Sequence, residues 1–521
     1  MTRISARRTT PEGWQETIRR MVSLNGVQLD PETARQVLRY LANNHGLAPE
    51  EALPAAFEVE KQSIDYHYSD KDTENTCHSC HSMGRVISQR RTKSDWELLV
   101  AMHRGYYPLS DFQAFRRFGP PQTTPGPDGR PPDNRHPMDK AIANLSGAFP
   151  LITPEWSAWS ANMRPARITG TWAIAGTQPG KGAIFGTMTI RAKDGADDEF
   201  ITSTKLTSAR SGETASREGK VIVYTGFQWR GRSTRAASNQ ASPDQEGLRE
   251  VMFIDRNMQS IKGRWYTGAY DEMGLEVEMT RIGAGPVVLG MDHPTLATGG
   301  SGTYTIFGAN LPANVAAGDI DFGAGVKVAR LVSATPSEIK VELNIAGDAK
   351  IGYRDLFVSG VVKERGAVVF DKVDEIRVKP QAGMARLGGA NFPKQFQQFE
   401  VIAYNYGPDG KPDTKDDLEL GPMTKVTWSV EEYAATYGDD DIKYVGTIDQ
   451  NGLFTPNVDG PNPQRPRNAN NVGDVWVVAV LTRTGKDKDG KDLPPLRARA
   501  HLLVTVPLYM RWDTPEVEGG K

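Results

Sequence analysis

Cysteine is almost absent from this sequence. Only Cys77 and Cys80 occur among 521 residues, which excludes a fold held together by several disulfides and a zinc site built from four cysteines. An excess of positive charge is also lacking, because 62 Lys and Arg stand against 64 Asp and Glu. Nucleic-acid binding is therefore not expected to be the main task. Long apolar runs are missing too, so we expect no membrane span.

The remaining composition is that of a multidomain globular protein. Hydrophobic residues make up 38% of the chain, enough for several buried cores. At about 150 residues per domain, the length predicts three or four domains. Trp14, Ile18 and Met21 recur on one helical face, and the pair Asp30-Pro31 predicts the start of a second helix. The proline-rich stretch 119–137 is interpreted as a surface loop.

From about residue 167 the pattern changes to that of β-structure. Short alternating runs, such as 183–190 and 260–266, lie between clusters of Gly, Asn and Asp. Strands at this spacing favour barrels and sandwiches. We therefore expect one α-helical module followed by three all-β modules. The expected boundaries are 1–165, 166–283, 286–379 and 380–521.

One motif in the helical module carries chemistry. Residues 77–81 read Cys-His-Ser-Cys-His, the C-x-x-C-H pattern that attaches c-type haem. The thiols of Cys77 and Cys80 add to the two vinyl groups of haem, and His81 then lies under the iron as an axial ligand. Zinc would need more Cys or His at ligand spacing, and a thioredoxin-like site would need a βαβ context. His78 is interpreted as a bystander.

An electron-transfer haem normally takes a second axial ligand, and an internal repeat suggests which residue it is. Residues 8–14 resemble residues 91–96 with one residue dropped. Met21 and His103 each stand seven residues past the Trp of their segment, two turns along one helical face. We predict His103 as the sixth ligand of the haem, and Met21 as a candidate axial ligand of a first haem in a tandem half. Other candidates are Met83, Met102, His136, Met138 and Met163, among which Met138 is the main rival.

The N-terminal stretch bears on the cellular compartment. Residues 1–13 contain no apolar secretion signal, which taken literally indicates the cytoplasm. The repeat register, however, places a first C-x-x-C-H just upstream of Met1. Because bacteria attach haem covalently outside the cytoplasm, we expect a missing upstream segment with this motif and a signal peptide, and a periplasmic protein. This chain would then carry one covalent haem c, and a longer chain two. The alternative is a first half that has lost its haem.

Three stretches carry a resemblance to a known family: RRTTPEGWQETIRRM, LDPETARQVLRYLANNHGL and TCHSCHSMGRVISQRRTKSDWELLVAMHRGYYP. They resemble the dihaem cytochrome c region of the quinohemoprotein amine dehydrogenase alpha subunit, and the resemblance extends over the whole chain. It implies a dihaem cytochrome c domain followed by three β domains, which we expect to be one β-barrel-like domain and two Ig-like β-sandwiches. The sequence departs from the family pattern, because the first of the two tandem halves of its cytochrome c-like domain lacks the attachment motif.

The resemblance also implies partners and a reaction. A β-propeller beta subunit and a small gamma subunit are expected, and cysteine tryptophylquinone on the gamma subunit would oxidise a primary amine to an aldehyde and ammonia. Electrons would then pass through the haem to a blue copper protein or a soluble cytochrome c. No catalytic residue is expected in this chain. The alternatives are an independent multidomain c-type cytochrome, either a carrier or peroxidase-like, and an extracellular binding protein.

An acidic segment offers a weaker signal. Residues 407–418 read GPDGKPDTKDDL and include Asp409, Asp413, Asp416 and Asp417 as candidate calcium ligands. The segment lacks the ligand alternation and terminal Glu of a helix-loop-helix calcium site. A solvated acidic hairpin is the favoured interpretation.

Overall fold

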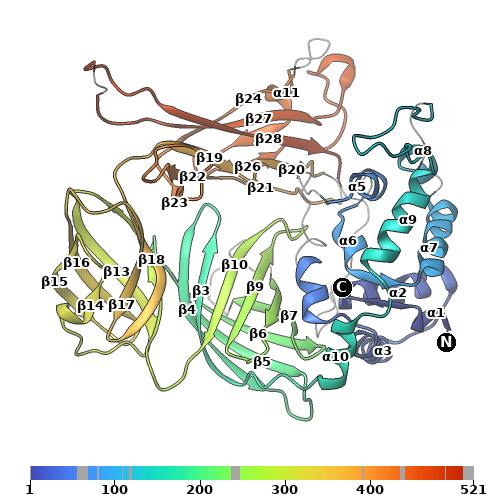
Figure 1. Ribbon diagram of the computed structural model, residues 1–521, viewed down its shortest axis with the longest axis horizontal. Coiled ribbons are helices and arrows are strands. Elements are labelled where there is room, and N and C mark those ends of the chain that lie inside the picture. Colours follow the sequence, from blue (N-terminus) through green and yellow to red (C-terminus); the bar gives the residue numbers. More distant parts are fainter. Residues whose placement is uncertain are drawn as a thin grey trace. The chain divides into compact units, whose positions relative to one another are not determined.

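A computed structural model of the protein describes residues 2–55, 68–78, 81–107, 109–115, 120–235, 247–389, 392–434, 440–486 and 489–507. The chain divides into two compact units. The first holds residues 1–165 and the turn Val223–Gln228, and the second holds most of the remainder. Figure 1 colours the chain from the blue N-terminal helices to the red C-terminal strands.

The first unit is helical. Its main elements are α1 Thr2–Ser5, β1 Arg7–Thr9, α2 Pro11–Asn25, α3 Pro31–Asn44, α4 Pro49–Ala52, α5 Lys71–Cys77, α6 Gly84–Ile87, β2 Gln89–Arg91, α7 Lys93–Tyr106, α8 Leu109–Gln113, α9 Pro137–Ala148 and α10 Pro154–Asn162. The side chains of Thr10 and Asp30 accept backbone N–H bonds at the starts of α2 and α3. The two helices expected from these residues are thus present, and residues 120–136 form a loop.

The two halves of this unit repeat one arrangement. β1 pairs antiparallel with β2, with Arg8 opposite Arg90. Thr10 caps α2 and Thr92 caps α7, each four residues before a Trp that is 2% exposed. The halves therefore align at a constant offset of 82 residues. The one-residue gap expected from the sequence is not present.

A second pair of helices extends the repeat. The N–H of Thr9 donates to the carbonyl of His45 at the end of α3 (3.1 Å), and the N–H of Arg91 donates to the carbonyl of Phe149 at the end of α9 (3.2 Å). α3 and α9 are thus equivalent. Residues 107–135, which lie between α7 and α9, have no counterpart between α2 and α3. This insertion contains α8 and the proline-rich loop.

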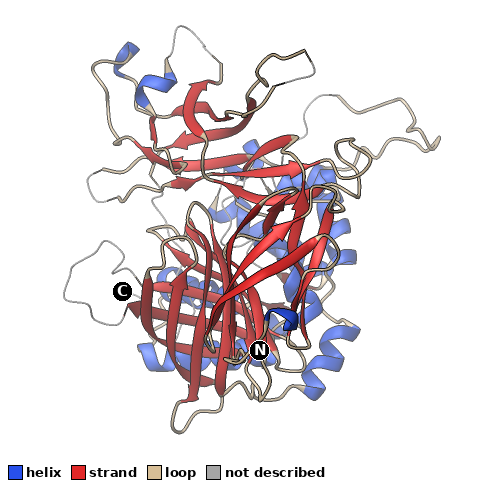
Figure 2. Ribbon diagram, turned by 90° about the vertical axis from the view of Figure 1, so that its left-hand side faces the viewer, coloured by secondary structure: helices blue, strands red, loops and turns tan. Residues whose placement is uncertain are grey.

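The second unit is built from strands (Figure 2). Eight of them close into an antiparallel barrel in the order β10-β3-β4-β5-β6-β7-β8-β9. They are β3 Gly170–Gln178, β4 Gly182–Ala192, β5 Glu199–Ser208, β6 Thr214–Tyr224, β7 Gln228–Arg235, β8 Leu248–Ile254, β9 Ser260–Thr267 and β10 Met273–Arg281. Trp172, Trp229 and Trp265 are fully buried, so these strands surround a filled core.

Two further strand assemblies follow the barrel. The first consists of the sheets β11-β13-β16-β15 and β12-β18-β17-β14, which share one apolar core. Its strands are β11 Val287–Met291, β12 Thr295–Ala297, β13 Ser301–Ala309, β14 Ile320–Asp321, β15 Val326–Ala334, β16 Glu338–Ile345, β17 Gly352–Val358 and β18 Val361–Phe370. Side chains from both sheets fill the core, which makes this assembly a sandwich.

The last assembly consists of the sheets β19-β22-β23, β20-β28-β27-β24 and β21-β26-β25 around a second shared core. Its elements are β19 Glu375–Lys379, β20 Ala382–Arg386, β21 Gln397–Gln398, β22 Glu400–Asn405, β23 Leu418–Met423, β24 Thr427–Glu432, α11 Asp441–Tyr444, β25 Gly446–Ile448, β26 Leu453–Pro456, β27 Gly473–Leu481 and β28 Leu496–Thr505. The expected order of a helical region and all-β parts with one barrel is confirmed. The Ig-like type of the last two parts and the four boundaries stay predictions. Among the described residues, no helix has the length and apolar character needed to cross a bilayer.

Candidate haem site

The first thiol of the C-x-x-C-H motif lies in an apolar setting. Cys77 is the last residue of α5 and packs against the apolar core that includes Met83 and Trp96. Burial, with a contribution from the charge of Asp70, raises the pKa of the Cys77 thiol to about 12. Cys80 lies outside the described residues. Because the half-buried Cys77 packs against apolar side chains, its surroundings suit a thioether bond to an apolar ring edge.

The structure brings His81 and His103 together. The centroids of their rings lie 6.5 Å apart, and the ring planes are inclined by 49°. Nδ1 of His81 lies 2.9 Å from the carbonyl oxygen of Ser82, and Nδ1 of His103 lies 2.8 Å from that of Leu99. With each Nδ1–H donating to a carbonyl, each Nε2 remains as the metal-binding nitrogen.

The distance between these rings fits a metal bound on both sides. An imidazole nitrogen binds a metal at about 2 Å, and about 1 Å more separates that nitrogen from the ring centre, so two rings on one metal lie about 6 Å apart. The observed separation of 6.5 Å is close to this value. The two histidines can therefore hold an iron atom between them.

Electrostatics favour the form of His81 that binds a metal. Burial lowers the pKa of His81 to about 4, and the neighbouring charges of Arg85 and His103 act in the same direction. The ring is therefore neutral at physiological pH. A neutral imidazole offers a lone pair to a metal, whereas an imidazolium does not.

The insertion between α7 and α9 places two aromatic residues next to His103. The ring of Tyr107 lies 6.0 Å from the His103 ring, and that of Phe115 lies 6.3 Å from it. Phe115 is only 6% exposed and packs against Met138 in a small apolar cluster. In the first half, which has no such insertion, Met21 is 41% exposed. Its role as an axial ligand of a first haem stays a prediction.

The rival ligands occupy other places. Met138 belongs to the cluster with Phe115, and Met83 is fully buried in the core against which Cys77 packs. The His136 side chain accepts the N–H of Met138 at 3.3 Å and so caps α9. Met163 follows the end of α10. His103, by contrast, has its ring 6.5 Å from that of His81.

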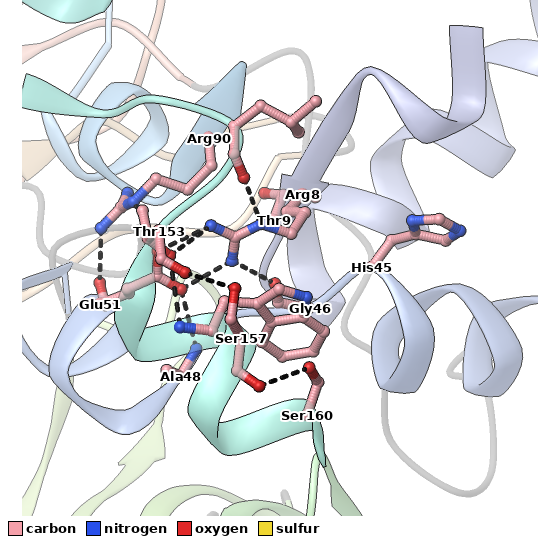
Figure 3. A network of polar contacts seen from close by, with 12 residues as sticks. Arg8, Thr9, His45, Gly46, Ala48, Glu51, Arg90, Thr153, Ser157 and Ser160 are labelled. Carbon is pink, nitrogen blue, oxygen red and sulfur yellow. Dashed lines mark hydrogen bonds and ion pairs between the residues drawn. The ribbon is translucent and has the colours of Figure 1, made fainter. Parts of the chain in front are cut away.

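A buried ion network joins the two halves, and sequence reasoning missed it. Arg8 donates to both carboxylate oxygens of Glu51 at 2.7 and 2.8 Å, and Arg90 donates to one of them at 3.1 Å. Thr153 donates to the same carboxylate at 2.9 Å. Figure 3 shows these groups converging on Glu51. The repeat of Arg8 and Arg90 was visible in the sequence, but their shared partner was not.

Glu51 stays ionised in this network. Burial alone would raise its pKa, but hydrogen bonds from Arg8 and the Ala48 N–H, with the charges of Arg8 and Arg90, outweigh that effect and lower the pKa. The Glu51 side chain is 4% exposed, and so is that of Arg8. The network therefore holds β1 and β2 together, one strand from each half of the repeat.

Family models match almost the whole chain. The haem-binding model of quinohemoprotein amine dehydrogenase A, alpha subunit, matches residues 1–119. The models for domains II, III and IV of the same subunit match residues 165–282, 287–371 and 376–517. The chain belongs to this alpha-subunit family. As an alpha subunit of a quinohemoprotein amine dehydrogenase, it is part of an oxidoreductase and has a haem-binding domain.

Other comparisons add little to the family assignment of this alpha subunit. A redesigned β-barrel matches with 18% identity, covering 22% of this chain and 92% of its own, with a TM-score of 0.19. A de novo designed fluorescence-activating β-barrel gives 18% identity, 22% and 93% coverage, and a TM-score of 0.17. No curated protein matches.

The acidic segment of the alpha subunit shows internal hydrogen bonding. The Thr414 hydroxyl lies 2.8 Å from an oxygen of Asp416 and 3.1 Å from one of Asp417. The N–H of Asp409 donates to Asp416 at 3.2 Å. Within the described ranges, no group of three or more His, Cys, Asp or Glu is arranged to hold a metal ion. Calcium binding at 407–418 therefore gains no support.

Proposed function

We propose that this alpha subunit carries c-type haem on Cys77 and Cys80, with His81 and His103 as the axial ligands, and transfers electrons during amine oxidation. The observation that carries the proposal is the pair of imidazoles 6.5 Å apart, each with Nδ1 next to a backbone carbonyl. The haem supplies reversible one-electron chemistry at its iron.

The residues of the chain have distinct tasks in this function. The carbonyls of Ser82 and Leu99 hold the two imidazoles in the tautomer that leaves Nε2 available. Tyr107 and Phe115 lie against the His103 ring, and the buried Phe115 gives that side of the site an apolar neighbour. Two nitrogen ligands also favour a lower potential than a nitrogen and a thioether would. A lower reduction potential suits a haem that passes electrons on to an acceptor in the periplasm.

The proposal also covers the partner subunits and the cellular location of this alpha subunit. Family membership supports assembly with a β-propeller beta subunit and with a small gamma subunit that carries cysteine tryptophylquinone. Electrons from the quinone would leave through the haem to a blue copper protein or a soluble cytochrome c in the periplasm. The amine would be oxidised on the gamma subunit, so this chain contributes no residue to that step.

The whole proposal is tested by purifying the tagged alpha subunit from its native host. We expect two further subunits, the smaller of which stains for a protein-bound quinone, and reduction of the haem when a primary amine is added to the complex. Isolation of the alpha subunit as a lone haem protein that amine does not reduce would favour an independent cytochrome instead.

The first specific prediction concerns haem attachment. Replacing both Cys77 and Cys80 by alanine should abolish covalent haem in this chain, because the sequence contains no other thiol. A haem stain on a denaturing gel measures this directly. His78→Ala is the matched control and should leave the stained band unchanged. A stained band in the double variant would refute the attachment site.

A further inference from the structure

The imidazole rings of His81 and His103 are inclined to each other by 49°. This angle matters for an iron atom bound by both rings, because the π-system of each imidazole overlaps with the iron d orbital that stands perpendicular to its ring plane. Parallel rings act on one d orbital, and perpendicular rings act on two of them equally. The angle between the ring planes therefore sets the splitting of these orbitals, and with it the g values of oxidised low-spin iron.

One hydrogen bond on each ring restricts its rotation. Nδ1 of His81 lies 2.9 Å from the Ser82 carbonyl oxygen, and Nδ1 of His103 lies 2.8 Å from that of Leu99. A carbonyl oxygen accepts hydrogen bonds over a broad range of directions. Such a bond fixes the place of Nδ1 more closely than the tilt of the ring plane. The orientation of the His103 plane therefore depends on further contacts of that ring.

Two aromatic rings from different elements make these contacts with His103. The Tyr107 ring lies 6.0 Å from the His103 ring at an inclination of 52°, and the Phe115 ring lies 6.3 Å from it at 57°. Both distances are typical of interacting aromatic pairs. Tyr107 follows one turn after His103 at the end of α7, whereas Phe115 follows α8 and donates its N–H to the Ser110 carbonyl at 2.9 Å.

Phe115 is the more firmly held of these two rings. It is 6% exposed and shares an apolar cluster with Met138 of α9, against which Val100 of α7 also packs. Val100 lies three residues before His103 on the same helix. The Tyr107 side chain is 48% exposed. Because closely packed interiors leave a side chain little freedom, the position of the Phe115 ring is fixed by both helices.

The two halves of the repeat differ in this feature. The insertion 107–135, which contains Phe115, is found in the half with His103 and has no counterpart between α2 and α3. The equivalent of His103 in the first half is Met21, which is 41% exposed. A methionine has no ring plane that a neighbour could orient. The insertion thus accompanies the half in which the orientation of a ligand ring has a consequence.

We propose that Phe115 is a positioning residue, which holds the His103 imidazole plane at its inclination to His81 and thereby sets the electronic structure of the oxidised haem iron. Tyr107 supports the same ring from its own helix. This inference rests on the proposed haem site at Cys77, His81 and His103. Neighbours that orient a metal ligand in this way tune the metal without touching it.

The test compares the haem-loaded wild type with Phe115→Leu by electron paramagnetic resonance of the oxidised protein. Leucine keeps an apolar side chain in the cluster and removes the planar ring. We expect the iron to remain low-spin, with its largest g value shifted or its signal split, because the His103 ring takes another orientation or more than one. A merely structural phenylalanine would lower the unfolding temperature and leave the g values unchanged.

Two further variants complete the experiment. Tyr107→Leu should give a smaller shift of the largest g value, since the exposed Tyr107 ring is held less firmly. Met138→Leu is the matched control, because it alters the same apolar cluster and keeps both rings beside His103. We expect this control to retain the g values of the wild type.

The outcomes separate this inference from the proposed function. If the wild type has covalent, low-spin haem and neither Phe115→Leu nor Tyr107→Leu changes the g values, the inference is wrong and the function stands. An equal shift in Met138→Leu also overturns it, because general packing would then orient the ligand. If Phe115→Leu binds no haem, Tyr107→Leu decides in the same way. A wild type without covalent haem contradicts the proposed function itself.

Discussion

His103→Ala is expected to convert the haem iron of this subunit from six-coordinate and low-spin to five-coordinate, high-spin and open to added ligands. The His103 ring lies 6.5 Å from that of His81, and its Nδ1 is held by the Leu99 carbonyl. Alanine removes the ring and leaves a space lined by Tyr107 and Phe115. Electron paramagnetic resonance of the oxidised protein and carbon monoxide binding to the reduced protein measure the change. We expect complete conversion.

The control for this variant is Met138→Leu. Met138 is 5% exposed and packs against Phe115, so leucine keeps the volume and removes the thioether. This variant should remain low-spin. The assignment of His103 fails if His103→Ala stays low-spin, or if Met138→Leu becomes high-spin.

Glu51→Gln is expected to cause the largest loss of stability in the helical unit. The substitution leaves the buried guanidinium groups of Arg8 and Arg90 without a counter-charge, although the shape of the side chain is kept. Removing one partner of a buried ion pair typically costs about 3–5 kcal/mol. Urea unfolding followed by the haem absorption, which reports on this unit, measures the change in the free energy of unfolding.

An exposed ion pair provides the comparison. Glu342→Gln removes the partner of Arg330, and both side chains are open to solvent. We expect no measurable change in unfolding, because water compensates both charges. If Glu51→Gln and Glu342→Gln changed the free energy of unfolding equally, burial would not be the reason for the stability that the Glu51 network contributes.

The Glu51 network also predicts a pH dependence. The pKa of the Glu51 carboxyl in the folded protein is lowered from its ordinary value of 4.5. The stabilisation from the ionised carboxylate is therefore fully present above the unfolded-state pKa and is lost as the pH falls through the folded-state pKa. Unfolding measured between neutral and strongly acidic pH should show this loss in the wild type. In Glu51→Gln that contribution should be missing.

Local patterns account for what the sequence predicted. The C-x-x-C-H spacing, the caps before α2 and α3, and the alternating runs in the strands each depend on residues close together in the chain. The seven-residue step from Trp96 to His103 is also local, because one helix carries both residues. Such features indicated the haem motif, the helical unit and the all-β modules, without deciding between barrel and sandwich.

The features that the sequence did not predict depend on contacts between residues far apart in the chain. Glu51 is 43 residues from Arg8 and 39 from Arg90, and no periodicity links these three positions. Nothing in the sequence singled out Phe115, and only the fold shows that its ring lies 6.3 Å from that of His103. The gap-free register also needed the structure, because it depends on the matching caps at Thr10 and Thr92.

The antiparallel pairing of β1 with β2 has a consequence for how far the two halves of this unit depend on each other. Arg8 lies opposite Arg90, its equivalent in the other half, which is the pattern of an isologous contact in a two-fold dimer. In a true dimer, symmetry would give each arginine its own copy of every partner. Here the linked halves share one glutamate, Glu51, which lies in the same half as Arg8. The second half on its own would therefore keep the buried Arg90 without the carboxylate that compensates its charge in the intact unit.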